Sequence, residues 1–131
     1  MINKEIYQNH FSELIAGGFD ACEHIENNQQ YIEIRKATIK SPPWNKTEVN
    51  ILIAVPANYN IGGLDAFYMD SQVVLANGQK HPRAQSKHQI LGREWWLISW
   101  HYQDGKPWSK EDNFITHVQH CRKFFKQGER S

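Results

Sequence analysis

The sequence predicts an α+β fold in which helices at the two ends of the chain lie on one side of an antiparallel sheet. Both ends carry apolar residues at the three- to four-residue spacing of a helix face. The segments between them are rich in β-forming residues, and their Pro and Gly residues fall singly or in pairs, as in turns. Because the strands are grouped rather than alternating with helices, we expect an antiparallel sheet.

The length of 131 residues and the mass of 15.4 kDa indicate one domain over residues 1–131. With 40% hydrophobic and 12% aromatic residues, the composition is not that of a disordered chain. Lys and Arg total 15 and Asp and Glu total 14, so the net charge is +1 and predicts no nucleic-acid partner. No apolar run reaches the roughly 18–20 residues that span a bilayer, so no membrane partner is expected. Only two cysteines are present, fewer than a secreted disulfide framework would use. The first residues are polar, unlike those of a signal peptide. Both observations predict a cytoplasmic location.

The first helix is predicted over Lys4 to Ala16, with one apolar stripe made of Ile6, Tyr7, Phe11, Leu14 and Ile15. Gly17-Gly18 ends it, since glycine tolerates the left-handed conformation found just past helices.

Strands are predicted next, at 31–39, 49–55, 66–69, 72–76 and 94–102. The segment 49–55 is apolar at nearly every position, which is typical of a strand buried on both faces. Asn77-Gly78 predicts a turn. The polar segment 81–92 carries no clear pattern and predicts neither a helix nor a strand.

The last helix is predicted to begin at Ser109, with Asp112 completing a near capping box, and to end at Gly128. Its apolar stripe consists of Phe114, Ile115, Val118, Cys121, Phe124 and Phe125.

The run Ser99-Trp100-His101 is the main catalytic candidate. A histidine at a strand end can project into a site, and it titrates near neutral pH. A structural histidine bonded to a loop carbonyl is an equally good interpretation. The sequence contains no G-x-S-x-G elbow, phosphate loop or dinucleotide fingerprint, so no cofactor is expected.

The two cysteines are interpreted as structural. Cys121 lies on the apolar stripe of the last helix and is predicted to be a small buried hydrophobe. His117 precedes it at a metal-ligand spacing, but two ligands do not make a site. Cys22 and His24 would share one face of a strand, and Cys22 is expected to be a partly buried edge residue. We therefore predict no metal site.

The tryptophans indicate a strand covered on both faces. Trp95 lies on one face, and Trp96 and Trp100 lie on the other. Either the strand is internal or one aromatic face meets a protein partner, because Trp and Tyr are common interface anchors.

Several runs resemble prokaryotic E2 family E, a bacterial branch of the ubiquitin-conjugating enzyme (UBC) superfamily. They are Leu64-Asp65-Ala66-Phe67-Tyr68, Trp96-Leu97-Ile98-Ser99-Trp100-His101 and the segment Trp108 through His117. Residues 49–59 look like the third strand of that superfamily and the loop after it. The resemblance implies a UBC-like fold: an N-terminal helix, a four-strand antiparallel meander, an active-site-like loop region and a C-terminal helix.

The resemblance also implies partners. These are a ubiquitin-like protein and an activating-enzyme-like (ThiF-type) protein, with a JAB-type peptidase as a third candidate. The expected contacts are the first helix and the binding candidates Asp65, Tyr68, Trp100 and Trp108.

One departure from the family pattern concerns the cargo-bearing cysteine. Residues 77–107 contain no cysteine, and Arg83 follows His81-Pro82 where the family has an asparagine. The leading hypothesis is a UBC-like binding or scaffold module that forms no thioester. The alternatives are an unconventional transferase using Ser99 or His101, and an unrelated small hydrolase using both. An unactivated hydroxyl is a far weaker nucleophile than a thiolate.

Overall fold

Two helices flank six strands in the computed structural model, which describes residues 4–41, 43–59, 64, 66–98, 108–109 and 111–128 (126–128 by backbone only). In chain order the elements are α1 Lys4–Ala16, β1 Ala21–Glu26, β2 Gln29–Thr38, β3 Glu48–Val55, β4 Phe67–Asp70, β5 Ala84–Ile90, β6 Arg93–Ile98 and α2 Phe114–Gly128. The α+β class with a helix at each end is confirmed.

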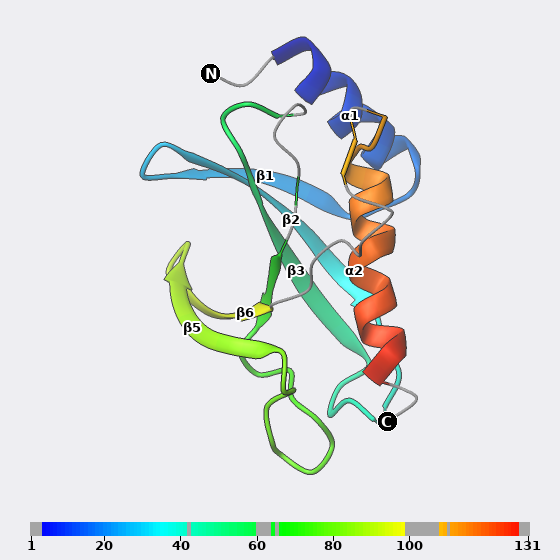
Figure 1. Ribbon diagram of the computed structural model, residues 1–131, viewed down its shortest axis with the longest axis vertical. Helices are drawn as coiled ribbons and strands as arrows, with labels where there is room; N and C mark the ends of the chain where they lie inside the picture. The colour runs from blue at the N-terminus through cyan, green and yellow to red at the C-terminus, as the bar shows by residue number, and fades with distance from the viewer. Residues whose placement is uncertain are drawn as a thin grey trace.

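The strands form one antiparallel sheet in the order β1-β2-β3-β4-β6-β5. The predicted four-strand meander corresponds to β1 through β4, and the β5–β6 hairpin extends it by pairing β6 with β4. Figure 1 shows both helices along one side of the sheet, while β5 and β6 curve toward the other side. We call these the helix side and the outer face.

The main core lies between the helices and the sheet. Ile32 and Ile53 from the sheet meet Leu14 of α1 and Phe124 of α2, and all four are almost completely buried. Near the start of α2, the rings of Tyr59 and Phe114 stack with their centroids 4.7 Å apart. The predicted stripes of both terminal helices therefore supply the helix side of the core, except that Ile15 of the α1 stripe is exposed instead of packed.

A second, smaller cluster lies on the outer face. Leu52, Ile90 and Trp95 are its buried members, and Tyr31, Tyr68 and Leu91 pack against them. Leu52 follows Ile51 of the main core, so β3 is buried on both faces, as its apolar run predicts.

The adjacent tryptophans of β6 divide between the two clusters. Trp95 belongs to the outer cluster and Trp96 to the main core. The strand is therefore internal to the fold, which is one of the two explanations that the sequence left open.

Two strands were missed, and one predicted strand is absent. β1 and β5 are the edge strands, and their exposed polar residues obscure the alternating pattern. Residues 72–76 were predicted to be a strand, but the structure has only an isolated bridge between Leu75 and Trp44.

The start of the last helix also differs from the prediction. α2 begins at Phe114, and its cap is Asn113, whose Oδ1 accepts a hydrogen bond from the Thr116 backbone N at 3.0 Å. The Asn113 backbone N donates in turn to Thr116 Oγ1 at 2.9 Å. Ser109 does bond Asp112, at 2.8 Å from its backbone N to Oδ2, but this forms a turn before the helix.

Candidate functional site

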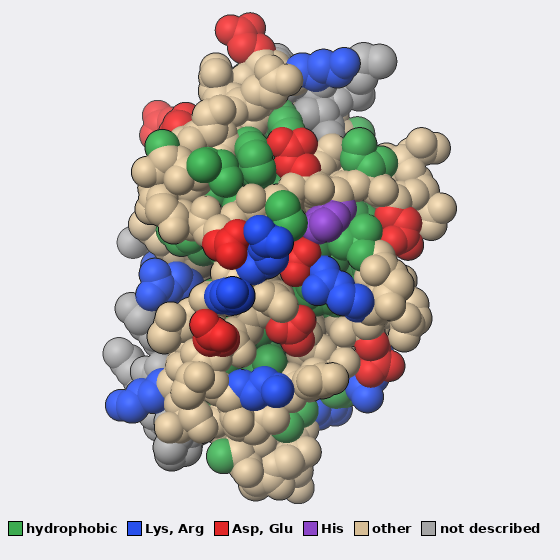
Figure 2. Space-filling view, turned by 180° about the vertical axis from the view of Figure 1, so that it is seen from behind, with side chains coloured by type: hydrophobic (Ala, Val, Ile, Leu, Met, Phe, Trp, Pro, Cys, Tyr) green, Lys and Arg blue, Asp and Glu red, His purple; other side chains and the backbone are tan. Residues whose placement is uncertain are grey.

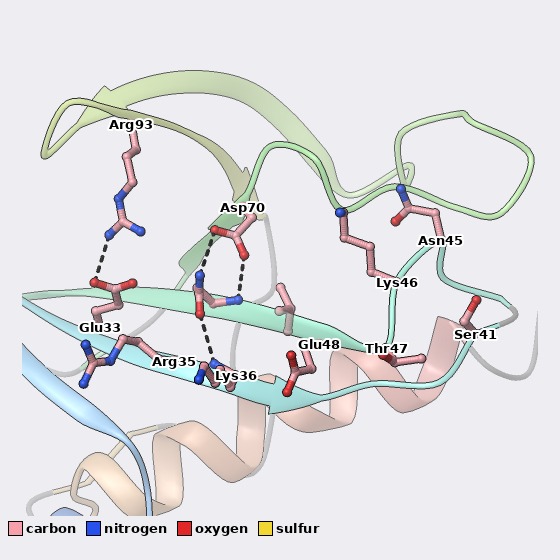
Figure 3. Close-up of a pocket in the computed structure, with 12 residues that line it drawn as sticks. Glu33, Arg35, Lys36, Ser41, Asn45, Lys46, Thr47, Glu48, Asp70 and Arg93 are labelled. Atoms are coloured by element: carbon pink, nitrogen blue, oxygen red, sulfur yellow. Dashed lines mark hydrogen bonds and ion pairs between the residues drawn. The ribbon is translucent and has the colours of Figure 1, made fainter.

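A hollow of about 680 Å³ lies on the outer face of the sheet. Its lining includes Glu33 of β2, Asn50 of β3, Asp70 of β4 and Arg93 of β6 (Figure 3). Period-two alternation puts Glu33, Asn50 and Asp70 on the face opposite the core residues Ile32, Ile51 and Met69 that precede or follow them. Seen from behind, the molecule gathers charged side chains of both signs around the middle of the view (Figure 2).

Two of the carboxylates that line the hollow, Asp70 and Glu33, are held by hydrogen bonds. The Asn50 backbone N donates to Asp70 Oδ2 at 2.7 Å. Burial raises the pKa of Asp70, and the bonds from Asn50 oppose that rise. Burial also opposes ionisation of Glu33, but the hydrogen bonds from Arg93 and His24 outweigh it, so the pKa of Glu33 is lowered. Glu33 is therefore a buried carboxylate held in its charged form.

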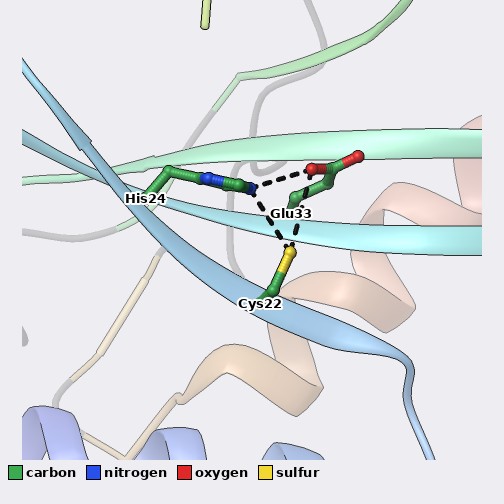
Figure 4. A group of neighbouring side chains, drawn as sticks. All are labelled: Cys22, His24 and Glu33. Atoms are coloured by element: carbon green, nitrogen blue, oxygen red, sulfur yellow. Dashed lines mark hydrogen bonds and ion pairs between the residues drawn. The ribbon is translucent and has the colours of Figure 1, made fainter.

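Cys22, His24 and Glu33 meet on the outer face beside this hollow (Figure 4). The distance from Cys22 Sγ to His24 Nε2 is 3.3 Å, and from His24 Nε2 to Glu33 Oε1 it is 2.9 Å. Cys22 Sγ lies 3.8 Å from the same carboxylate oxygen. Arg93 Nη2 donates to that oxygen at 2.8 Å. Among the described residues, these three form the one group of His, Cys, Asp and Glu side chains able to hold a metal ion.

The backbone of β1 and β2 fixes this group. Cys22 and Glu33 are direct partners in the ladder, and His24 lies two residues along β1 on the same face. Cys22 and His24 stand out in the sequence as a pair on one strand face, whereas Glu33 and Arg93 do not. The signal for Glu33 was Asn27-Asn28: a two-residue turn there pairs Glu26 with Gln29 and therefore Cys22 with Glu33.

The Cys22 thiol is unsuited to nucleophilic attack in this environment. Partial burial, followed by the negative charge of Glu33, raises its pKa, and Arg35 offsets only part of the rise. A catalytic thiol needs a lowered pKa or a free adjacent base, and the neighbouring His24 Nε2 is already bonded to Glu33 at 2.9 Å. Cys22 is partly buried on an edge strand, as predicted.

Cys121 and His117 lie in the main core. Cys121 is 0% exposed, which confirms the prediction of a buried hydrophobe, and burial raises the pKa of its thiol. His117 is also fully buried, and burial lowers its pKa to about 3, with a smaller contribution from His120. Within the described ranges, no third ligand joins this pair.

The predicted site residues are only partly within the structure. Ser99, Trp100, His101 and Asp65 lie outside the described residues, so their predicted roles stay predictions. Tyr68 packs in the outer cluster, with its ring centroid 5.6 Å from that of His88.

Trp108 packs on the helix side instead, where its ring centroid lies 6.0 Å from that of Tyr59. The structure therefore places the binding candidates Tyr68 and Trp108 on opposite faces of the sheet.

The run His81-Pro82-Arg83 does not form an open site. The His81 ring stacks on Trp44 at 5.6 Å and contacts Phe124 at 4.7 Å. Burial lowers its pKa, followed by the charges of Arg83 and Lys80. His81 Nδ1 accepts a hydrogen bond from the Arg83 backbone N at 3.1 Å, so this histidine has a structural role in the turn before β5.

Comparison with known families gives one match. The model of the family described as "Prokaryotic E2 family E" matches residues 12–127, from within α1 through almost all of α2. No curated protein and no solved structure matches the chain. Within the residues described, neither helix is long and apolar enough to cross a bilayer. Proteins of the E2 class work with a ubiquitin-like protein and an E1-type activating protein. The match covers nearly the whole chain and agrees with its helix–sheet–helix architecture, so the chain belongs to prokaryotic E2 family E and is an E2-like protein of a prokaryotic ubiquitin-like pathway.

Proposed function

We propose that this E2-like domain is a non-catalytic binding or scaffold module, which holds the ubiquitin-like protein or its ThiF-type activating protein without a cysteine thioester. The observation that carries the proposal is where the two cysteines of the chain lie: neither is in the segment that would bear the cargo, and one is buried in the core. Cys121 is 0% exposed in the core, so a protein cargo cannot reach it without unfolding α2. Residues 77–107, where the family resemblance places the cargo-bearing residue, contain no cysteine.

Cys22 does not replace the missing residue. It lies on edge strand β1 on the outer face, and its raised pKa keeps the thiol protonated at neutral pH. A protonated thiol is a poor acceptor in a thioester exchange, because the thiolate is the nucleophile.

The low cysteine content also supports a cytoplasmic location.

We place the partner contact on α1. Its Ile15 is 46% exposed, and with Ile25 it is one of two large hydrophobic side chains that stand exposed in the described structure. Exposed apolar side chains beside polar ones are typical of protein contact surfaces. Tyr68 and Trp108 are less suited to one contact surface, since they lie on opposite faces of the sheet.

The test of chemistry is an adduct assay. The chain is incubated with a ubiquitin-like protein, its activating enzyme and ATP, and then run on denaturing gels with and without a thiol reductant or hydroxylamine. We expect the activating enzyme to be charged and the chain to show no adduct. The Cys22→Ala and Cys121→Ala variants should behave like the wild type.

Three outcomes would overturn the proposal. An adduct cleaved by the thiol reductant and lost in Cys22→Ala or Cys121→Ala would show a thioester. An adduct resistant to the reductant and lost in Ser99→Ala would show an oxyester and support the transferase alternative. An adduct lost in a His101→Ala variant but kept in Ser99→Ala would place the chemistry on that imidazole.

The test of the surface is a pair of matched substitutions. Ile15→Asp on α1 should weaken binding of the activating protein or the ubiquitin-like protein by about tenfold or more, because it removes one apolar contact. A tenfold change in affinity corresponds to about 1.4 kcal/mol of binding free energy. Ile25→Asp at the β1–β2 hairpin replaces a more exposed isoleucine outside α1 and should leave binding within about twofold. Equal effects of the two substitutions, measured by titration calorimetry, would contradict the α1 contact.

A further inference from the structure

We propose that Cys22, His24 and Glu33 form a binding site for one divalent transition-metal ion of the zinc class. The site lies on the outer face, away from the α1 contact surface. Each residue supplies one ligand of a different kind: a sulfur, an imidazole nitrogen and a carboxylate oxygen.

The separations of the three ligand atoms are within about 0.5 Å of those around a tetrahedral ion. Zinc binds sulfur at about 2.3 Å and nitrogen or oxygen at about 2.0–2.2 Å, so its ligand atoms lie about 3.3–3.6 Å apart. The observed separations are 3.3 Å from sulfur to nitrogen, 3.8 Å from sulfur to oxygen and 2.9 Å from nitrogen to oxygen. Adjustments of about 0.5 Å in side chains would place all three around one ion.

The geometry favours a metal over a Cys–His–acid triad. In a triad the acid bonds one ring nitrogen and the nucleophile bonds the other. Here Cys22 Sγ and Glu33 Oε1 both approach the same atom, His24 Nε2. One N–H cannot donate fully to both, so the arrangement relays no proton. Three ligand atoms that all lie within 4.8 Å of one another are instead close enough to share one ion.

The supporting side chains are placed as metal sites require. The Glu33 side chain is 4% exposed, while the His24 side chain is 31% exposed, so an ion can enter from the His24 side. Arg93 donates to Glu33 from the neighbouring hairpin. Carboxylate ligands are commonly held by such outer hydrogen bonds. Arg93 now bonds Oε1, the same oxygen that would face the ion, so ion binding requires Arg93 to move to the second carboxylate oxygen.

The ligand set points to the zinc class of ions. Thiolate and imidazole suit Zn²⁺ and its neighbours, whereas Mg²⁺ and Ca²⁺ take oxygen ligands. Three protein ligands leave a fourth position for water or for a side chain of a bound protein. Because the ligands come from β1 and β2, the ion would also fasten the edge strand to the sheet.

The test uses the tag-free, reduced full-length chain, stripped of metal and titrated with Zn²⁺ and separately with Co²⁺. We expect one ion per chain, a thiolate-to-cobalt absorption band and a Zn²⁺-dependent rise in unfolding temperature, because the ion binds the native state. Cys22→Ala and His24→Ala should weaken binding by at least about 100-fold, since even outer hydrogen-bonding partners contribute 10- to 100-fold. Circular dichroism checks that each variant is folded.

Two matched controls retain all three ligands. Cys121→Ala removes the other thiol and should keep the cobalt band, and His88→Ala removes a histidine elsewhere on the outer face and should keep the wild-type affinity. The proposal fails if the wild type gives no thiolate band, or if folded Cys22→Ala binds zinc as tightly as the wild type. Loss of the band in Cys121→Ala alone would assign the ion to the other thiol and would also overturn the site.

Discussion

At the scale of single residues, burial decides the chemistry of His117. This imidazole lies in the core, and its pKa falls to about 3 from an ordinary value near 6.5, because burial penalises the charged form. Below pH 6.5 the unfolded chain binds a proton there, whereas the folded chain does not until about pH 3. Acid therefore favours unfolding across this window, and the stability contributed by neutral His117 is lost as the pH falls.

We predict that His117→Leu removes part of the acid sensitivity. From this one group, the free energy of unfolding of the wild type should fall by up to about 1.4 kcal/mol per pH unit below pH 6. Urea unfolding of both proteins at pH 7, 6, 5 and 4 measures the two slopes. The variant should show the shallower slope, and identical slopes would mean that the folded protein binds the proton at His117.

At the scale of elements, a two-residue turn fixes the β1–β2 hairpin. Asn27 and Asn28 both have positive φ, at 51° and 65°. Such values fit the right-handed twist of the flanking strands, and Asn and Gly tolerate them best. The turn sets the register that brings Glu33 opposite Cys22.

We predict that Asn28→Val lowers the free energy of unfolding by about 1–2 kcal/mol, because a β-branched side chain is strained at positive φ. Asn28→Gly is the matched control and should stay within about 0.5 kcal/mol of the wild type, since glycine adopts this conformation readily. Urea unfolding at pH 7 compares the three proteins. An equal loss in both variants would indicate that the Asn28 side chain, rather than its backbone conformation, stabilises the hairpin.

At the scale of the whole molecule, β3 joins two cores. Ile53 faces the helices and Leu52 faces the outer cluster, and both are 0% exposed. The outer cluster also includes Ile90 and Trp95 of the β5–β6 hairpin. The Leu91 backbone N of that hairpin donates to Glu26 of β1, so the two ends of the sheet meet across the outer face.

We predict that Leu52→Ala and Ile53→Ala each lower the free energy of unfolding by about 2–5 kcal/mol, since each leaves a cavity. Their local effects should differ. Leu52→Ala should speed hydrogen exchange in β5 and β6, and Ile53→Ala should speed it in α1 and α2. The same exchange pattern in both variants would show that the two cores unfold as one unit.

The sequence by itself determined the class of the fold, the two terminal helices and the doubly buried strand β3, because their apolar residues recur at the period of each element. Short runs in it also resemble prokaryotic E2 family E, and the match of the family model over residues 12–127 confirms that family. The sequence did not reveal β1 and β5, whose edge positions need few apolar residues, or the cap at Asn113.

Only the tertiary structure decided which side chains meet. Strand register placed Glu33 beside Cys22 and His24, and the curvature of the β5–β6 hairpin brought Arg93 to the same carboxylate from 60 positions away. Packing also decided that Cys121 is closed to solvent. Periodicity in a sequence reports which face of an element is buried, whereas contacts between strands depend on turns and sheet curvature, which act over the whole molecule.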